Sequence, residues 1–523
     1  MERKVSEHAT QDGFKEQFPK NLLSNIAYFL INIIIGIFLV PYFIGTLGVA
    51  AYGLIPLATS FTSYVTILTD SLNIAVSRFL TVDIHQKNFE KANRTFNTAL
   101  FGLSGVILLL IPVVVLLSYY APKFFNVPAG QEFGVIVLFF GVSASFLIRS
   151  WSSNFTVSLF AYNRLDLLNL LNILVVIIQV SLIVVLFTTF SPQLEFIGFA
   201  YLVSSLVFLS GAIVLSKRIN PHLRMDIHDF DRLRLKELTA MGWWAVVDMI
   251  GSLFFLQIDL IAVNLLFGAT AAGEYAVVFV WATFLRGIAW TLAGVLSPMI
   301  LTYYAKGNID QIIDMSKSAV KGLGLVIALP IGLICGFAPS ILTLWLGPQF
   351  AHLAPLIWLL ILPLAVNLCI LPLYTICVAF NKIRTPGIVT LFLGVGNVIL
   401  IFTLPLLLGW GFYGVAISGA IMFTLKNTFF TPWYTTKIMG ISTNTFTKSM
   451  IAGVFAALIV AGVTAGIGKI FIISSLINLA LFCGVISVVY LIVIWFIGLN
   501  QYEREIVTNY IPEKYRGIVL YIR

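Results

Sequence analysis

The residues best suited to bind a ligand or to take part in chemistry are charged side chains inside long apolar segments. Arg149 and Arg286 lie far from the ends of the apolar segments 134–160 and 275–302. An ionised side chain at the centre of a bilayer costs about 2.5–3.5 kcal/mol on insertion scales, so it needs a partner or a water-filled cavity. Guanidinium groups hold phosphate oxygens through paired hydrogen bonds. The sequence therefore leaves two interpretations open, a cavity for an anionic ligand and an internal salt bridge.

Five further charged residues belong to the same candidate set. Arg78 and Lys426 are expected nearer to helix ends, from where a long side chain can reach the headgroup region. Asp70, Asp248 and Asp259 are candidates to neutralise an arginine or to bind a coupling ion, because acidic groups at membrane depth commonly serve proton or ion pathways.

Uncharged polar residues recur at helical spacing in several of these segments. Asn32, Asn73 and Trp290 are the members that we assign to a ligand cavity. Such stripes either bond neighbouring membrane helices or line a cavity, and the pattern does not decide between the two. The stripes are Asn21, Asn25, Tyr28, Asn32 and Gly36; Thr59, Ser63, Thr66, Asp70, Asn73 and Ser77; Ser145, Arg149, Ser152 and Thr156; Trp244, Asp248, Ser252 and Asp259; and Thr283, Arg286, Trp290 and Ser297.

Membrane-spanning helices must position these residues. The 523-residue chain is 59% hydrophobic and 10% charged, whereas soluble domains carry about 25% charged residues. A spanning helix needs roughly 20 apolar residues, and the alternation typical of barrel strands is absent. We expect an all-α polytopic membrane protein with 14 transmembrane helices near residues 22–44, 51–77, 96–119, 134–160, 166–189, 195–216, 240–266, 275–302, 319–342, 353–379, 387–408, 412–435, 449–468 and 471–498.

The distribution of basic residues predicts the orientation of these helices. With the N-terminus in the cytoplasm, 25 of the 31 Lys and Arg residues fall in cytoplasmic segments, and four (Arg78, Arg149, Arg286 and Lys426) fall within or at the ends of spans. Only Lys123 and Lys469 fall in external segments. The net charge of +9 thus reflects topology, and we expect no nucleic-acid partner. The first twenty residues lack an apolar signal region, so the first helix is expected to direct insertion. We expect a multi-pass protein of the inner (cytoplasmic) cell membrane, with both termini in the cytoplasm.

An internal repeat divides the chain into two halves. Val40, Gly45 and Tyr52 recur 223 residues later as Val263, Gly268 and Tyr275. Later landmarks recur at offsets of 220 and 218, namely Asn88, Gly102 and Leu103 as Asn308, Gly322 and Leu323, and 161–164 as 379–382. Two six-helix lobes related by a pseudo-twofold axis along the membrane normal are expected. The predicted parts are an N-lobe (1–216), a cytoplasmic loop (217–238), a C-lobe (239–437), and two extra helices with an interfacial tail (438–523).

The sequence offers no sign of catalysis. It contains no Walker lysine motif, no paired histidines at metal spacing and no nucleophile elbow. The four cysteines lie inside apolar runs and have neither disulfide nor metal spacing. We expect neither an enzyme nor a cofactor.

Four stretches of the chain resemble a known family. They are PYFIGTLGVAAYG (41–53), SRFLTVDIHQKNFEKANRTFNTAL (77–100), FAYNRLDLLNL (160–170) and GEYAVVFVWATFLRGIAWTLAGVLSPMI (273–300). These stretches are similar to Wzx-type polysaccharide flippases. That family belongs to the MOP superfamily, which also holds the MATE drug exporters and the MurJ lipid II flippase. The resemblance spans about residues 20–440.

The resemblance implies a function that the residues alone do not reach. It implies alternating-access transport of an undecaprenyl-diphosphate-linked oligosaccharide from the inner to the outer leaflet, for O-antigen, capsule or exopolysaccharide biosynthesis. Arg149, Arg286, Arg78 and Lys426 match the basic residues of the family's cavity by analogy. The candidate partners are the polyprenyl-diphosphate-linked glycan, membrane lipid, a coupling ion (Na⁺ or H⁺) and a glycan polymerase.

Three other functions stay open. A MATE-like cation-coupled drug exporter would favour carboxylates in its cavity, and three buried aspartates keep that hypothesis alive. A MurJ-like lipid II flippase would share the helix count and the basic cavity. A membrane scaffold for glycan-assembly enzymes would tolerate charge changes in the spanning helices.

Overall fold

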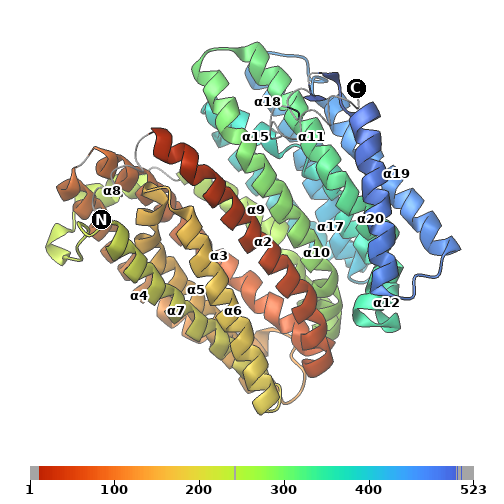
Figure 1. Ribbon diagram of the computed structural model, residues 1–523. Coiled ribbons are helices and arrows are strands. Elements are labelled where there is room, and N and C mark those ends of the chain that lie inside the picture. The colour runs from red at the N-terminus through yellow and green to blue at the C-terminus, as the bar shows by residue number, and fades with distance from the viewer. Residues whose placement is uncertain (1–10, 87, 241–242, 502, 505–507, 509–523) are drawn as a thin grey trace. The chain divides into compact units, whose positions relative to one another are not determined.

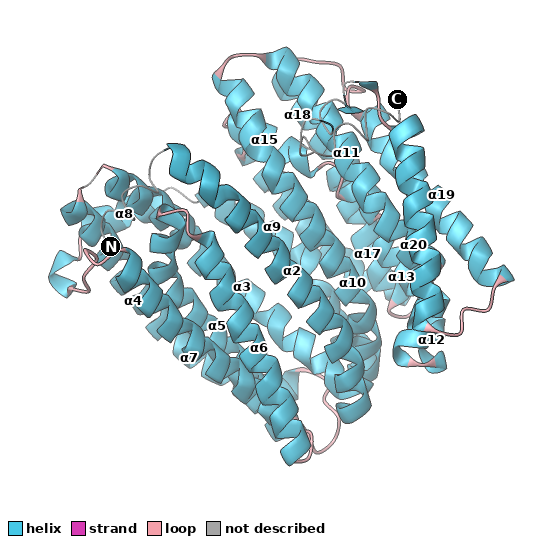
Figure 2. Cartoon of the chain, viewed as in Figure 1, coloured by secondary structure: helices cyan, strands magenta, loops and turns pink. Residues whose placement is uncertain are grey.

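The computed structural model is helical throughout the part of the chain that it describes, which is residues 11–86, 88–240, 243–501, 503, 504 and 508 (Figure 2). Among these residues, side chains are not described at several positions, including 64–75 and 78. The all-α class expected from the sequence is confirmed. The contacts divide the chain into two compact units, which we treat separately.

Unit 1 comprises residues 1–277 and 387–415. Within it, α5 packs against α7, α3 and α4, and α6 packs against α7 and α2 (Figure 1). Its helices are α2 (Gln11–Leu47), α3 (Val49–His85), α4 (Phe89–Phe124), α5 (Glu132–Ala161), α6 (Leu165–Thr189), α7 (Leu194–Ile219), η1 (Ile227–Asp229), α8 (Arg232–Ala240), α9 (Trp243–Leu256), the first part of α10 (Ile258–Ala305) and most of α16 (Arg384–Leu408).

Unit 2 comprises residues 278–386 and 416–523. Its central pair is α11 and α19, which pack along much of their length. Its helices are the second part of α10, α11 (Ile309–Gly336), α12 (Ala338–Leu346), η2 (Pro348–Leu353), α13 (Ala354–Ile361), α14 (Leu364–Asn367), α15 (Leu371–Ala379), most of α17 (Tyr413–Thr424), η3 (Leu425–Phe430), α18 (Thr431–Met439), α19 (Thr447–Ile470), α20 (Leu476–Val493) and η4 (Ile494–Gly498). The lobe boundaries drawn from the repeat stay a prediction.

Eleven helices in the described part of the chain are long and apolar enough to span a membrane. The difference from the fourteen expected segments has three local reasons. Segments seven and eight fall within one stretch, 246–294; the second segment is described with its side chains only in part; and the twelfth is interrupted at η3. The tenth is split into short helices around Pro355, Pro363 and Pro372, because proline ends or kinks a helix. Fourteen helices remain consistent with the structure.

The repeat is visible in local backbone geometry. Asn163 and Asn381, which lie 218 residues apart, have φ values of 54° and 53°, and both end a helix in the same way. Asn88 and Asn308 both cap a helix, and each side chain accepts a backbone N–H bond of 3.1 Å three residues later. These two pairs of landmarks therefore mark equivalent positions.

The register of the repeat at the first turn is 220 rather than the expected 223. Gly48 and Gly268 hold the left-handed backbone positions of the two turns, with φ values of 85° and 89°. Five residues further on, Gly53 and Gly273 approach so closely that a Cβ added to Gly53 would lie 2.5 Å from the Gly273 nitrogen. Only glycine permits this crossing. The alignment of Tyr52 with Tyr275 in the sequence is therefore three residues out of register.

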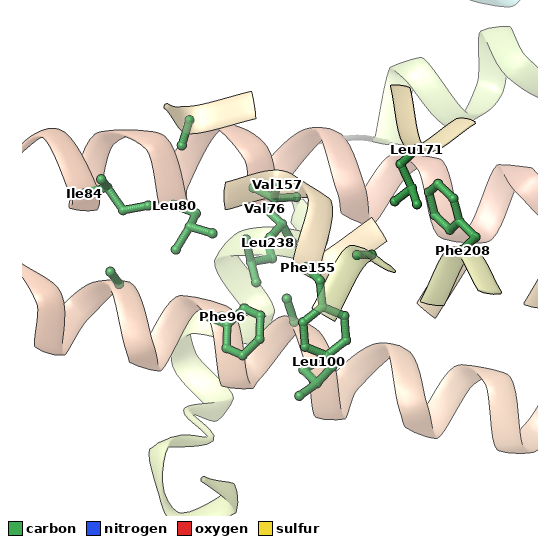
Figure 3. Packing of buried hydrophobic residues seen from close by; sticks show 14 of the residues in the cluster. Val76, Leu80, Ile84, Phe96, Leu100, Phe155, Val157, Leu171, Phe208 and Leu238 are labelled. Atoms are coloured by element: carbon green, nitrogen blue, oxygen red, sulfur yellow. The ribbon is translucent and has the colours of Figure 1, made fainter. Parts of the chain in front are cut away.

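The core of unit 1 lies where α3, α4, α5 and α7 meet. Phe96 and Leu100 from α4 face Phe155 from α5, with Val76 from α3 beside them (Figure 3). Gly141 and Gly198 let α5 and α7 touch, because a Cβ on Gly141 would lie 2.3 Å from the Gly198 carbonyl oxygen. Leu238, from the segment that follows α7, is 1% exposed and completes the cluster.

The segment after α7, expected as a loop at 217–238, is bound to unit 1 by a ladder of hydrogen bonds. Asn93 donates to the His222 carbonyl oxygen at 2.9 Å, and Asn97 donates to the Arg224 carbonyl oxygen at 2.8 Å. Arg234 then forms a 2.7 Å ion pair with Asp83, which is 3% exposed. We call residues 220–238 the linker. It is a packed part of unit 1.

Candidate functional site

Arg149 points from α5 toward α6 and α7. Its guanidinium donates to Oδ1 of Asn172 at 2.8 Å and lies 4.4 Å from the centre of the Phe208 ring. It lies 12 residues before the end of α5, about 18 Å along the helix axis. Within the described residues no carboxylate pairs with it. A neutral amide and an aromatic face orient the guanidinium and leave its charge available.

Two aspartates of unit 1 have different surroundings. Asp259 is 3% exposed, and the hydroxyl of Tyr275 donates to it at 2.8 Å. Asp248 on α9 is half-buried, and one of its carboxylate oxygens is buried without a hydrogen-bond partner. A buried acceptor without a donor is costly, and Asp259 already receives the Tyr275 hydroxyl, so we keep Asp248 as the candidate for an ion or proton. Neither aspartate pairs with Arg149, so the salt bridge considered for that pair is not formed.

Asn32 and the other polar residues of the first helix serve more than one purpose. The Asn32 amide donates to the Tyr28 carbonyl oxygen of its own helix at 2.7 Å. Asn21, in contrast, donates to the Asn163 side chain at 2.9 Å and accepts from the Asp166 backbone N–H at 3.0 Å. The lower part of this stripe thus bonds α2 to the turn before α6, while Asn32 stays a candidate for cavity lining.

Unit 2 holds the cationic residues Arg286 and Lys426. The Arg286 guanidinium lies half-buried on α10, 5.5 Å from the centre of the Phe279 ring. Trp290, one turn further along α10, is 58% exposed and presents a free aromatic face.

Lys426 is buried rather than extended toward a helix end. It is 5% exposed, and its ammonium lies 5.2 Å from the centre of the Tyr374 ring. The helical run continues from Tyr413 to Met439, so Lys426 lies 13 residues from each end, about 20 Å. The expectation that it could reach the surface is wrong because this helix extends further than its apolar stretch.

Lys426 also lies in a π-helical turn, η3. In this turn the Thr431 backbone N–H donates to the Lys426 carbonyl oxygen five residues back, and the Thr431 hydroxyl donates to the same oxygen at 3.0 Å. The neighbouring Asn427 donates to the Asn367 carbonyl oxygen at 3.2 Å, which ties the turn to α14. Single π-helical turns are rare and occur often at functional sites. Sequence reasoning had no signal for this turn.

Three of the expected site residues, Asp70, Asn73 and Arg78, have side chains outside the described ones. The remaining residues are distributed over both units, with Arg149, Asn32, Asp248 and Asp259 in unit 1 and Arg286, Trp290 and Lys426 in unit 2. A single cavity shared by these residues stays a prediction. Sequence reasoning missed the contact residues Asn172, Phe208 and Tyr374, because no spacing within one helix shows which residue of another helix faces it.

The arrangement is suited to binding an anion. Arg149, Arg286 and Lys426 each lie against an aromatic ring within helices rich in apolar side chains, and a low dielectric strengthens the interaction of a cation with a negative charge. No group of three or more His, Cys, Asp or Glu in the described part of the chain could hold a metal ion.

The fold is similar to that of two membrane proteins of known structure. An inward-facing MATE multidrug transporter matches with a TM-score of 0.60 at 15% identity, over 84% of this chain and 96% of that one. The lipid II flippase MurJ, in an inward closed conformation, matches with a TM-score of 0.53 at 16% identity, over 85% of this chain and 98% of that one.

The chain belongs to the polysaccharide biosynthesis protein family, whose model matches residues 18–303. It is 32% identical to an uncharacterized membrane protein, EpsK, of Bacillus subtilis (strain 168), over 491 residues, which are 94% of this chain and 97% of that protein. The family resemblance seen in the sequence is confirmed, and the chain is a multi-pass membrane protein.

Proposed function

We propose that this protein is a flippase that moves an undecaprenyl-diphosphate-linked oligosaccharide from the inner to the outer leaflet by alternating access. The observation that supports the proposal is that cationic side chains lie against aromatic rings in both units of a polysaccharide biosynthesis protein. A diphosphate is the part of such a substrate that needs cationic partners in a medium of low dielectric. The product of transport would feed assembly of a surface polysaccharide.

The proposed roles follow from the chemistry of each side chain and, where the side chain is described, from its contacts. Arg149 and Arg286 would hold diphosphate oxygens, with Lys426 and Arg78 adding charge as the substrate passes. Asn32, Asn73 and Trp290 would contact sugar hydroxyls and ring faces, because amides bond hydroxyls and exposed indoles stack on sugars. Asp248 is the proposed site for a coupling ion, Na⁺ or H⁺, and Asp70 and Asp259 would balance charge.

The orientation is part of the proposal. The basic residues favour the inner cell membrane with both termini in the cytoplasm. The C-terminal tail, expected along the inner surface, lies mostly outside the described residues. Reporter fusions after Arg218 and after Lys469 check the orientation, since we expect a cytoplasmic signal from the first and an external signal from the second.

The central experiment is complementation. In cells that lack the gene, we expect the wild-type copy to restore surface glycan. Arg286→Ala should reach the membrane, fail to restore glycan and accumulate lipid-linked sugar inside, while Arg286→Lys should restore part of the activity because charge remains without the planar fork. Arg218→Ala, which changes an exposed arginine at the end of α7, is the matched control. Full activity of Arg286→Ala would sink the cavity hypothesis.

Two other functions are separated by complementation of a second strain and by drug resistance. A lipid II flippase would rescue cells that lack their own lipid II flippase, whereas we expect no such rescue. A cation-coupled drug exporter would leave surface glycan unchanged on deletion and would lower resistance to cationic drugs. Coupling is tested in vesicles, where transport that persists after both Na⁺ and H⁺ gradients are collapsed would exclude a role for Asp248 in coupling.

A further inference from the structure

Unit 2 contains a polar pocket that the proposed transport function does not use. Its volume is about 470 Å³, and it lies between the N-terminal half of α11 and the first turn of α19, beside the segment that follows η4. Three lysines dominate its lining. The lining residues are Asp314, Lys317, Ser318, Lys321, Lys448, Ser449, Asn500 and Glu503.

The packing of α11 against α19 sets the three lysines at one level. The two helices touch at Gly324 and Gly453, where an added Cβ on Gly453 would lie 2.8 Å from the Gly324 backbone. They run in the same direction, because Gly336 meets Thr464 further along. Counted back from the glycine contact, Lys448 lies level with residue 319. Lys317 and Lys321 therefore lie about 3 Å to either side of it along the axis.

The acidic residues of the pocket neutralise only part of this charge. Lys321 forms a 2.7 Å ion pair with Glu503, whose side chain is 8% exposed and also accepts the Asn500 backbone N–H at 2.9 Å. Lys317 lies 3.8 Å from Asp314, and both side chains are largely exposed, so this pair is weak. Lys448 has no acidic partner in the part of the chain that the structure describes. Lys317 and Lys448 are thus available to a ligand.

The repeat shows that the same helix face is covered in unit 1. At the offset of 220 set by Asn88 and Asn308, Lys317 and Ser318 correspond to Asn97 and Thr98. In unit 1, Asn97 and Thr98 bind the backbone of the linker, and Leu235 of the linker lies 3.0 Å from an added Cβ on Gly102. In unit 2 the corresponding Gly322 has open space around it. A surface that binds peptide in one unit has become an open, basic pocket in the other.

The level of the pocket along the helices identifies the kind of ligand. Lys448 and Lys469 stand at opposite ends of α19, 21 residues or about 31 Å apart, which matches the thickness of a bilayer's hydrocarbon core. Lys448 is therefore at the depth of the lipid headgroups. Basic pockets between spanning helices at this depth suit anionic headgroups. We propose that this pocket binds the phosphate group of an anionic lipid headgroup through Lys317 and Lys448, with Ser318 and Ser449 donating further hydrogen bonds.

The test uses the purified full chain in detergent, titrated with phosphatidylglycerol, with phosphatidylcholine, or with inorganic phosphate. A ligand that binds the folded state raises the thermal midpoint, and the dependence on concentration gives its affinity. We expect phosphatidylglycerol to raise the midpoint of the wild-type protein. We expect the double variant Lys317→Gln/Lys448→Gln to bind it at least roughly tenfold more weakly, because each lysine near a headgroup contributes about a factor of five.

Two controls separate the pocket from general surface charge. Lys469→Gln changes the lysine at the other end of α19, and Lys382→Gln changes an exposed lysine outside the pocket. Both should bind phosphatidylglycerol like the wild type. Equal binding by the double variant, or equal loss in either control, would overturn the proposal. Stabilisation by inorganic phosphate alone would overturn the assignment to a lipid. A double variant that melts like the wild type without lipid shows that folding is preserved.

Discussion

The N-terminal parts of α4 and α11 have the same backbone geometry but bind different groups. Both follow an asparagine cap, and in both the cap's backbone N–H bonds to a carbonyl oxygen five residues earlier, Asp83 for Asn88 and Tyr303 for Asn308. Both helices carry a glycine fourteen residues after the cap. The repeat has therefore kept the backbone that starts these helices.

The side chains that follow the caps differ in kind. On α4, short amides and hydroxyls face the linker and satisfy its backbone groups. Asn97, for example, makes two such bonds: it accepts from the Asp226 backbone N–H at 3.0 Å and donates to the Arg224 carbonyl oxygen. On α11, the matching positions hold Lys317 and Ser318, and Lys321 lies one turn further on. Backbone geometry is shared by the repeat, whereas a few polar substitutions decide what binds there.

The largest expected effect comes from the buried ion pair between Arg234 and Asp83, whose acidic residue has no acidic counterpart at the corresponding position of unit 2. Arg234 pairs with Asp83 and also donates to the Thr95 hydroxyl at 3.0 Å, and that hydroxyl donates to Asp83 at 2.7 Å. Arg234→Ala therefore removes a partner from both residues. Removing one partner of a buried pair leaves an uncompensated charge, so we expect a loss of about 3 kcal/mol and a clearly lower thermal midpoint. The positions of α11 and α10 that correspond to Thr95 and Asp83 are Met315 and Tyr303.

The matched control for this prediction is Glu237→Ala. Glu237 bonds the same guanidinium at 2.9 Å, but its side chain is 56% exposed, so its removal should cost less than about 1 kcal/mol. A similar loss in both variants would mean that burial of Asp83 is not what matters.

A second prediction compares the corresponding residues directly. Asn97→Ala removes two bonds to the linker and should cost about 2 kcal/mol, because buried backbone groups lose their partners. Lys317→Ala loses only a weak, exposed ion pair and should cost no more than about 0.5 kcal/mol. Trypsin cleavage after Arg224 gives an independent measurement, and it should accelerate in Asn97→Ala alone. Unchanged cleavage would show that α4 does not hold the linker.

The sequence predicts much of this fold because its signals are long or repeated. Apolar segments of spanning length, and the nearly constant offset between repeated residues, can be recognised without any knowledge of packing. The register at the first turn was missed for a local reason. The chain offers Gly45, Gly48 and Gly53 there, and only the backbone shows that Gly48 takes the left-handed position. The breaks in the tenth segment were signalled by three prolines, whose spacing near one every nine residues opposes a single straight helix.

The candidate site was less accessible to sequence reasoning. The positions of Arg149 and Arg286 inside apolar segments were evident, but their neighbours were not. Asn172 and Phe208 come from other helices, and their contact with Arg149 depends on helix rotation and crossing. Lys317 and Lys321 have the i, i+4 spacing of one helix face, which gives a signal for the pocket. That spacing indicates a binding pocket only once the structure shows that Lys448 of α19 lies next to these two lysines.

A third prediction tests the part that the two helices share. Asn88→Ala and Asn308→Ala each remove a cap whose side chain accepts a 3.1 Å bond from a backbone N–H. Loss of an asparagine cap typically costs about 1 kcal/mol. We expect equal losses within about 0.5 kcal/mol, measured as shifts of the chemical-denaturation midpoint. Clearly unequal values would show that the surroundings, rather than the cap, stabilise one of the two helix starts.

The smallest expected effect asks whether the linker holds its own shape or takes it from α4. Asp226 is exposed, and its carboxylate accepts the His228 backbone N–H at 2.9 Å and faces the His228 ring at 2.8 Å. The backbone bond, followed by the ring contact, lowers the pKa of Asp226 below its ordinary value. A lowered carboxyl pKa stabilises the fold above the unfolded-state pKa, and this contribution is lost as the pH falls through the folded-state pKa.

Asp226→Ala should therefore speed amide exchange at His228 a few-fold at pH 7, with a shift of the thermal midpoint of about 1 °C or less. As the pH falls through the folded-state pKa of Asp226, the variant and the wild type should converge. A large fall in the midpoint would mean that this local turn, and not the Asn97 ladder, holds the linker on α4, and the contrast with the open pocket on α11 would then need another cause.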